Sequence, residues 1–293
     1  MFFIKQFLIA LVLSSFVLGV SARESVSMQE TSSEQAPPKS TLTTSILTLS
    51  ESSQTGEPGA TVNQQIKIIQ IKGAISRKLL ANLKSNISAT GDDPIPAGLI
   101  ILLDSRGGDG MAAIEIGRLL RKANAHVFVN GECSSACILV LAGGVVRGAP
   151  TFSIGIHQAR ITLSSDSGVI KKEVNANEDP LAKSLLEKFN TSAAVYFSDM
   201  EIPPDLFIAM QSHPSKRIYR LSSHEITAYG LNGIEPNYLI ERTQMYAQRP
   251  GRWPKDPDEL MRRTTKVSTE CMRFDSNPVD FTKCYRKVLQ DIY

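Results

Sequence analysis

The chain has 293 residues, with 32 basic and 29 acidic side chains and a formal net charge of +3. This length allows one sizeable domain or two small ones, since single cores usually stop growing at about 250 to 300 residues. The charges are spread along the chain without a dense basic run. That pattern argues against a nucleic-acid-binding class, and we expect no nucleic-acid partner.

The first 22 residues are typical of a secretory signal peptide. Lys5 precedes an apolar stretch over residues 7–20, and small residues lead to a cleavage site between Ala22 and Arg23. The apolar stretch is shorter than the span of about 20 residues that crosses a membrane. An uncleaved anchor is the alternative, and we expect membrane contact only in that case. The mature chain is therefore expected to be periplasmic or secreted.

Residues 23–61 are rich in Ser, Thr, Glu, Gln, Pro and Gly, and they contain almost no aromatic side chains. Such a segment cannot bury enough apolar surface to offset the entropy that ordering costs. We therefore predict a disordered linker over residues 23–61 and a folded part that begins at residue 62.

From residue 62 onward, short apolar runs alternate with helical patterns. Helices are predicted at 76–85, 111–123 and 135–144, and strands at 67–72, 98–104, 126–130, 145–147 and 152–157. The run at 98–104 is apolar on both faces, as expected of a buried strand. Strands and helices that alternate with short connections indicate an α/β fold of repeated βαβ units around a mostly parallel sheet.

The later part of the chain is predicted to be more helical. Residues 178–211 form a helical stretch that breaks at Pro203 and Pro204, because proline suits the first turn of a helix better than its interior. The phrase IYRLSSHEITAYGLNG that follows combines an extended run with a helix, which a capping box begins and a glycine ends. We predict a C-terminal appendage over residues 243–293.

The chain has four cysteines, in two local pairs: Cys133 with Cys137, and Cys271 with Cys284. An oxidising compartment allows disulfides to persist. Four cysteines permit three pairings, of which local pairing is the simplest, and the alternative is free thiols packed as small apolar groups. No histidine or second close pair completes a zinc ligand set, so no metal is expected.

Three short motifs carry polar groups suited to chemistry. SRGGDG follows a predicted buried strand, GECSSACILV places Ser135 before an apolar helix, and IGIHQ places His157 22 residues later at the end of a strand. A serine at this point can attack a carbonyl if backbone amides hold the resulting oxyanion and a histidine takes its proton. Each motif also has a structural interpretation: a glycine turn, a helix N-cap and a surface histidine.

The order and spacing of the three motifs resemble the Clp protease proteolytic subunit family within the crotonase-like superfamily. The similarity is greatest to exported relatives in which cysteines flank the nucleophile phrase, and it covers roughly residues 65–242. The resemblance implies a Clp-protease-like domain over residues 62–242, with Ser135 as nucleophile, His157 as general base, and Gly108 and Ala136 as oxyanion-hole donors. It also implies a peptide or protein substrate, no cofactor, and self-association into rings or trimers.

The chain departs from the family pattern at the third catalytic residue. The family has an aspartate shortly before the phrase that matches IYRLS, whereas no acid lies between Met210 and Arg220 here. Ser215 lies near the expected position, Asp205 lies upstream, and a dyad of serine and histidine is a further option.

Three functions are open at this stage. The first is an exported serine peptidase. The second is a catalytically weak or inactive scaffold that kept the fold, which the missing acid favours. The third is an acyl-thioester enzyme of the crotonase branch, which fits the glycine turn but neither the serine nor the histidine.

Overall fold

The computed structural model describes residues 40–52, 61–88, 98–164, 170–249, 251–272 and 277–290. The chain divides into two compact units, and all the described residues belong to the second unit, Ala36–Tyr293. The predicted signal peptide and the parts of the predicted linker at 23–39 and 53–60 lie outside the described residues.

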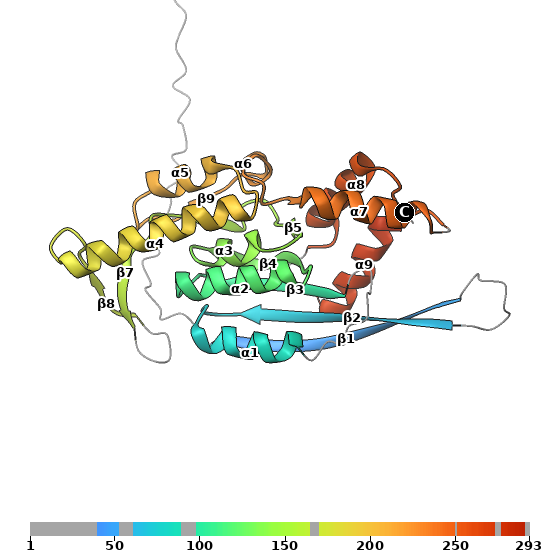
Figure 1. Cartoon of the computed structure of the whole chain (residues 1–293), viewed down its shortest axis with the longest axis horizontal. Helices are drawn as coiled ribbons and strands as arrows, with labels where there is room; N and C mark the ends of the chain where they lie inside the picture. The colour runs from blue at the N-terminus through green and yellow to red at the C-terminus, as the bar shows by residue number, and fades with distance from the viewer. Residues whose placement is uncertain are drawn as a thin grey trace, which may run out of the picture. The chain divides into compact units, whose positions relative to one another are not determined.

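A mixed eight-stranded sheet forms the centre of this unit (Figure 1). Its strands run in the spatial order β1-β2-β3-β4-β5-β10, while β6 pairs with β4 and β9 pairs with β6. The inner pairs β2–β3, β3–β4, β4–β5 and β4–β6 are parallel, and β1, β9 and β10 join antiparallel. The strands are β1 (Thr41–Ser52), β2 (Thr61–Lys72), β3 (Leu99–Ser105), β4 (His126–Ser134), β5 (Val146–Gly148), β6 (Ile154–Ile156), β9 (Tyr219–Arg220) and β10 (Gly233–Ile234).

A separate two-stranded hairpin, β7 (Ile161–Ser164) with β8 (Ile170–Val174), follows β6 in the chain. The sequence interpretation assigned no strands to this segment.

The helices begin where the sequence supplies caps. Asp109, Asp179 and Asp256 accept hydrogen bonds from the first amides of their helices, and the predicted capping box of Ser222 and Glu225 is confirmed. The predicted break at the two prolines is also confirmed, since α4 ends at Asp199 and α5 begins at Pro204. The helices are α1 (Arg77–Ser88), α2 (Gly110–Lys122), α3 (Cys137–Ala142), α4 (Pro180–Asp199), α5 (Pro204–Ser212), α6 (Ser223–Ala228), α7 (Pro236–Ala247), α8 (Pro257–Glu270) and α9 (Pro278–Gln290).

The central strands of the sheet are buried on both faces, and alternate residues of a strand pack into different cores. In β3, Ile101 and Leu103 pack into a core that includes α1, α2 and α3, whereas Ile100 and Leu102 pack into a second core with α7, α8 and α9. Side chains of a strand alternate between the two faces of its sheet, so an apolar run without alternation requires cover on both sides. The predicted double burial of this strand is confirmed.

The predicted disordered linker was wrong over Thr41–Ser52. This segment forms β1, which pairs antiparallel with β2 along its whole length. Its polar residues are mainly threonine and serine, and threonine favours extended backbone. Leu42 packs against the first core and Leu47 against the second, which gives this polar strand two apolar anchors.

The C-terminal residues are part of the fold rather than an appendage. Helix α7 runs through the expected boundary at residue 243, and α7, α8 and α9 supply eight of the eighteen buried residues of the second core. A buried polar group reinforces the contact: His126 on β4 bonds Tyr238 on α7 at 2.6 Å and Tyr285 on α9 at 3.0 Å. The apolar positions of α8 and α9 cover a sheet face that would otherwise lie open.

Within the residues that the structure describes, no helix is both long enough and apolar enough to cross a membrane.

Candidate active site

The SRGG motif forms a tight turn between β3 and α2. Gly107 and Gly108 have φ values of +102° and +146°, a region that glycine occupies at little cost. Two main-chain hydrogen bonds join the turn to Ile75. The Ile75 N–H donates to the Gly107 carbonyl, and the Ile75 carbonyl accepts from the Asp109 N–H, both at 2.9 Å. A Cβ on Gly108 would lie 2.2 Å from the Ile75 carbonyl oxygen, so only glycine fits at this position.

The N–H of Gly108 points away from Ile75. In the parallel bridge with Ile75, the flanking residues Gly107 and Asp109 make the hydrogen bonds, and the groups of the central residue point to the opposite side. The amide of Gly107 is already used, since it donates to the Ser105 hydroxyl at 3.1 Å. Gly108 is exposed. Of the two glycines, Gly108 is therefore the one whose N–H can reach a ligand.

Ser135 occupies a left-handed turn between β4 and α3, with a φ of +56°. This conformation is uncommon outside glycine and costs about 1 to 3 kcal/mol, and such positions cluster at functional sites. The turn is held at both ends: the Ser135 amide donates to the Gly155 carbonyl at 2.9 Å, and its carbonyl accepts from Ile138 at 3.1 Å. Ala136 is the N-cap of α3 and no side chain caps the helix, so neither Ser134 nor Ser135 has the structural role of an N-cap.

The two turns lie in direct contact. A Cβ on Gly107 would approach the Cβ of Ser135 to 2.8 Å and the amide nitrogen of Ala136 to 3.0 Å. The absence of a side chain at Gly107 is therefore what lets the serine turn pack against the glycine turn. The fold thus brings together three of the residues that the motifs predicted: Gly108, Ser135 and Ala136.

A disulfide brackets the serine turn. Cys133 and Cys137 are bonded with a Cα separation of 5.2 Å, and both are fully buried. The second pair, Cys271 and Cys284, joins the end of α8 to α9. The first bond fixes the chain on either side of Ser135, and the second fixes the helices that cover the opposite face of the sheet.

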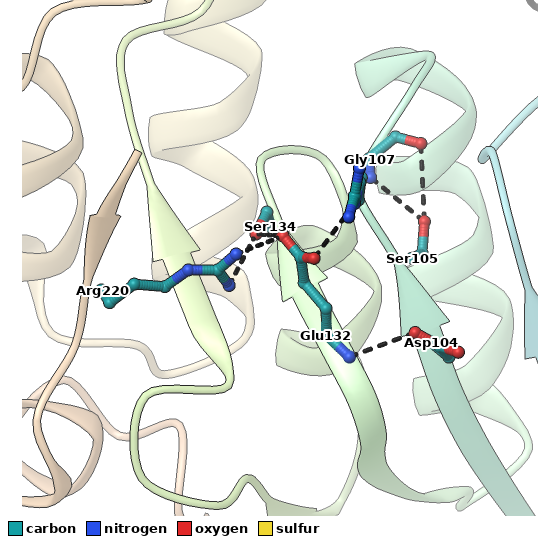
Figure 2. A network of polar contacts seen from close by, with 7 residues as sticks. Asp104, Ser105, Gly107, Glu132, Ser134 and Arg220 are labelled. Carbon is teal, nitrogen blue, oxygen red and sulfur yellow. Dashed lines mark hydrogen bonds and ion pairs between the residues drawn. The ribbon is translucent and has the colours of Figure 1, made fainter. Parts of the chain in front are cut away.

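The neighbouring serine, Ser134, is held in a polar network (Figure 2). Its hydroxyl donates to Glu132 at 2.8 Å and accepts from Arg220 at 3.3 Å, and Arg220 also pairs with Glu132. Ser134, Gly155 and Arg220 lie opposite one another on β4, β6 and β9. Because Gly155 has no side chain, Arg220 can reach across β6 to Ser134, as Figure 2 shows.

This network favours the ionised form of Glu132 and engages the Ser134 hydroxyl in hydrogen bonds. Burial acts to raise the pKa of the Glu132 carboxyl, but hydrogen bonds from Ser134 and Arg220 and the charge of Arg106 outweigh it and hold the pKa below its usual value. Ser134 is fully buried, whereas Ser135 is half-buried. Ser135 therefore offers the accessible hydroxyl of the two.

His157 follows β6, the strand that lies beside the end of β4. The parallel register places Ser134 opposite Gly155, and neighbouring strands are about 4.8 Å apart. His157 therefore leaves the sheet beside the Ser135 turn. Its Nδ1 lies 2.7 Å from the carbonyl oxygen of Gln158. Burial lowers the pKa of His157, an effect that the Gln158 contact opposes and the charge of Arg160 assists.

No hydrogen bond joins Ser135 to His157 among the described residues. The two candidates for a third catalytic residue, Asp205 and Ser215, occupy other parts of the fold. Asp205 sits in the first turn of α5, and Ser215 lies between α5 and β9. Neither bonds to His157 in the part of the chain that the structure covers. The charged groups that act on His157 are Arg160 and Glu173, which pair with each other at 3.2 Å.

Sequence reasoning missed several features of this site. The Gln158 carbonyl gives no sequence signal, because every residue carries one. Glu132 and Arg220 are 88 positions apart, and only the pairing of β4, β6 and β9 brings them together. Across the described ranges, no group of three His, Cys, Asp or Glu side chains is arranged to hold a metal ion.

Comparisons with known proteins yield similarities to solved structures alone. No protein-family model matches the chain, and no curated protein matches it. A ClpP1 mutant from Listeria monocytogenes is similar with 17% identity and a TM-score of 0.39, over 56% of this chain and 88% of that one. A mutant of the membrane-bound stomatin-specific protease 1510-N is similar with 19% identity and a TM-score of 0.40, over 60% of this chain and 82% of that one.

Proposed function

We propose that this protein is an exported serine peptidase that hydrolyses peptide bonds through an acyl-enzyme on Ser135. One observation carries the proposal: the strained Ser135 turn packs directly against the glycine turn that presents the Gly108 amide. Acyl transfer to serine requires a hydroxyl, amide donors for the oxyanion and a base, and Ser135, the amides of Gly108 and Ala136, and His157 are the groups that would supply them.

The proposed reaction uses the chain's own groups at each step. His157 accepts the hydroxyl proton at Nε2 while the Ser135 oxygen attacks the carbonyl carbon of the substrate. The carbonyl oxygen becomes an oxyanion, which the amides of Gly108 and Ala136 hold. His157 then gives the proton to the departing amine as the carbon–nitrogen bond breaks. A water molecule, deprotonated in turn by His157, hydrolyses the acyl-enzyme and restores Ser135.

The substrate class, the export and the self-association belong to the same proposal. Each rests on the motifs SRGG, GECSSAC and IGIHQ and on the N-terminal sequence. The two disulfides are consistent with an oxidising compartment.

The test is cleavage of a defined peptide pool by the purified, oxidised protein, followed by mass spectrometry. Wild-type protein should cleave, and Ser135→Ala and His157→Ala should each lower the rate by roughly 10⁴-fold or more. Ser134→Ala is the matched control, since it removes an adjacent hydroxyl that the network already occupies. It should retain cleavage. Cleavage by Ser135→Ala at the wild-type rate would overturn the proposal.

The second candidate is a scaffold of the same fold with weak or no hydrolysis. It is favoured by the lack of a bond between Ser135 and His157 and of a carboxylate bonded to His157 among the described residues. A scaffold would bind peptides from the same pool without cleaving them, and Ser135→Ala would leave that binding unchanged in calorimetry. Cleavage that depends on Ser135 would exclude it.

A further inference from the structure

We propose that the main-chain carbonyl of Gln158 takes the place of the missing acid, by orienting His157 and fixing the tautomer in which Nε2 is free to accept a proton. This inference rests on the proposed function and names a positioning residue for it. It also explains why the segment between Met210 and Arg220 needs no carboxylate.

The contact determines where the imidazole proton lies. The Nδ1 of His157 is 2.7 Å from the Gln158 carbonyl oxygen, a normal hydrogen-bond distance. A carbonyl oxygen can only accept, so Nδ1 must carry the hydrogen. In the neutral ring, Nε2 then has the free electron pair that a general base needs. A catalytic acid provides the same tautomer control in a triad.

The carbonyl can serve this purpose because Gln158 is held by both its main chain and its side chain. The Gln158 amide donates to the His213 carbonyl at 2.8 Å, and its side-chain amide donates to the Gln211 carbonyl. Both acceptors lie at the C-terminal end of α5, where the last carbonyls of a helix have no partner inside it. Gln211 is tied in turn to Asn190 on α4 at 3.2 Å. The end of α5 therefore fixes Gln158, the residue whose carbonyl orients His157.

The charges around His157 are consistent with a neutral orienting group. Arg160 and Glu173 act on it in opposite directions and pair with each other. A carbonyl aligns the ring but brings no full negative charge to stabilise the imidazolium that forms during reaction. The proposal therefore predicts catalysis that is insensitive to the nearby acids but sensitive to how Gln158 is held.

The direct test is long-range proton–nitrogen NMR of the full protein with labelled histidines, using His157→Gln to assign the ring. At neutral pH the spectrum should show Nδ1 protonated and Nε2 unprotonated, in wild type and in Asp205→Asn and Glu173→Gln. In kinetics, Asp205→Asn and Glu173→Gln should change kcat less than about threefold, whereas loss of a true catalytic acid costs up to about 10⁴-fold.

A matched pair of variants tests the role of α5. Gln158→Met removes the side-chain bond to the Gln211 carbonyl and keeps the main-chain carbonyl. It should lower kcat roughly fivefold with KM unchanged, as expected for one hydrogen bond, and mix the two tautomers in the NMR spectrum. Gln244→Met makes the same substitution at an exposed position on α7, away from α5, so it should change neither kcat nor the tautomer.

The outcomes separate this inference from the proposed function. A loss of about 10³-fold or more in kcat in Asp205→Asn or Glu173→Gln, with cleavage still dependent on Ser135, would overturn the orienting role of the Gln158 carbonyl but not the proposed peptidase activity. If wild-type protein cleaves nothing, the NMR reading still decides: an Nε2-protonated ring overturns the inference, and an Nδ1-protonated ring supports it.

Discussion

The buried histidine of β4 makes the stability of this protein depend on pH. His126 is nearly inaccessible to solvent and bonds two tyrosine hydroxyls, one on α7 and one on α9. Burial, assisted by the charge of Arg242, lowers its pKa from 6.5 to about 3. Below pH 6.5 the unfolded chain therefore binds a proton that the folded chain excludes, so stability falls as the pH falls from 6.5 towards 3.

The size of the effect follows from the two pKa values. Between pH 7 and pH 5 the unfolded histidine becomes almost fully protonated while the folded one stays neutral, which corresponds to about 2 kcal/mol at about 1.4 kcal/mol per unit. His126→Gln removes the titration. The variant should be less stable at pH 7 but should lose about 2 kcal/mol less than wild type between pH 7 and pH 5.

Urea unfolding at pH 7, 6 and 5, with the disulfides intact, measures this difference. Because the effect comes from linkage, it should show in the midpoint and not in the slope with denaturant. His224→Gln is the matched control, since His224 is exposed, and it should keep the wild-type pH dependence. Equal pH dependence in wild type and His126→Gln would refute the reasoning and with it the buried contact between β4 and the C-terminal helices.

Three further predictions concern the site. Gly108→Ala should lower kcat at least about 100-fold, because its Cβ would meet the Ile75 carbonyl at 2.2 Å and displace an oxyanion donor. Gly233→Ala, whose Cβ would meet nothing within 4 Å, should stay within about twofold. Because burial lowers the pKa of His157 and the base must be neutral, a pH–rate profile should lose activity only as the pH falls below 6.5, and a midpoint above 6.5 would contradict this. Replacing both cysteines of the Cys133–Cys137 disulfide by alanine should lower the free energy of unfolding in urea by about 2 kcal/mol, against about 3 kcal/mol for the Cys271–Cys284 disulfide, which closes a longer loop. Loss of the first disulfide should nevertheless lower kcat more, because it flanks Ser135. The reverse order in kcat would count against a role of that disulfide in positioning the serine turn.

The central elements of the fold could be predicted because their sequence signals are local. The run at 98–104 has no polar alternation, and it forms β3 with both faces buried. The two prolines after α4 mark the start of a new helix at Pro204. In both cases the residue types fix the backbone directly, through burial on two sides or through a missing amide donor.

The outer elements could not be predicted because their signals depend on partners. Residues 41–52 resemble a linker in composition, and they form β1 only because β2 offers an edge to pair with. The C-terminal helices look detached in sequence, but they cover a sheet face that only the tertiary structure reveals.

At the candidate site, residue types were predictable and contacts were not. The motifs indicated Ser135, His157, Gly108 and Ala136, and the turns that carry three of them do meet. The sequence could not show that Gly107 makes this contact, that Ser134 is occupied by Arg220, or that a backbone carbonyl lies on Nδ1 of His157. Each depends on strands that lie side by side but are distant in the chain.

The most direct test of an activated Ser135 is reaction with a fluorophosphonate, followed by peptide mapping of the modified residue. The proposed mechanism predicts a single stoichiometric adduct on Ser135, which Ser135→Ala abolishes, His157→Ala slows strongly and Ser134→Ala leaves in place. Failure to form an adduct at any pH between 5 and about 9, where the histidine is neutral over most of the range, would contradict it.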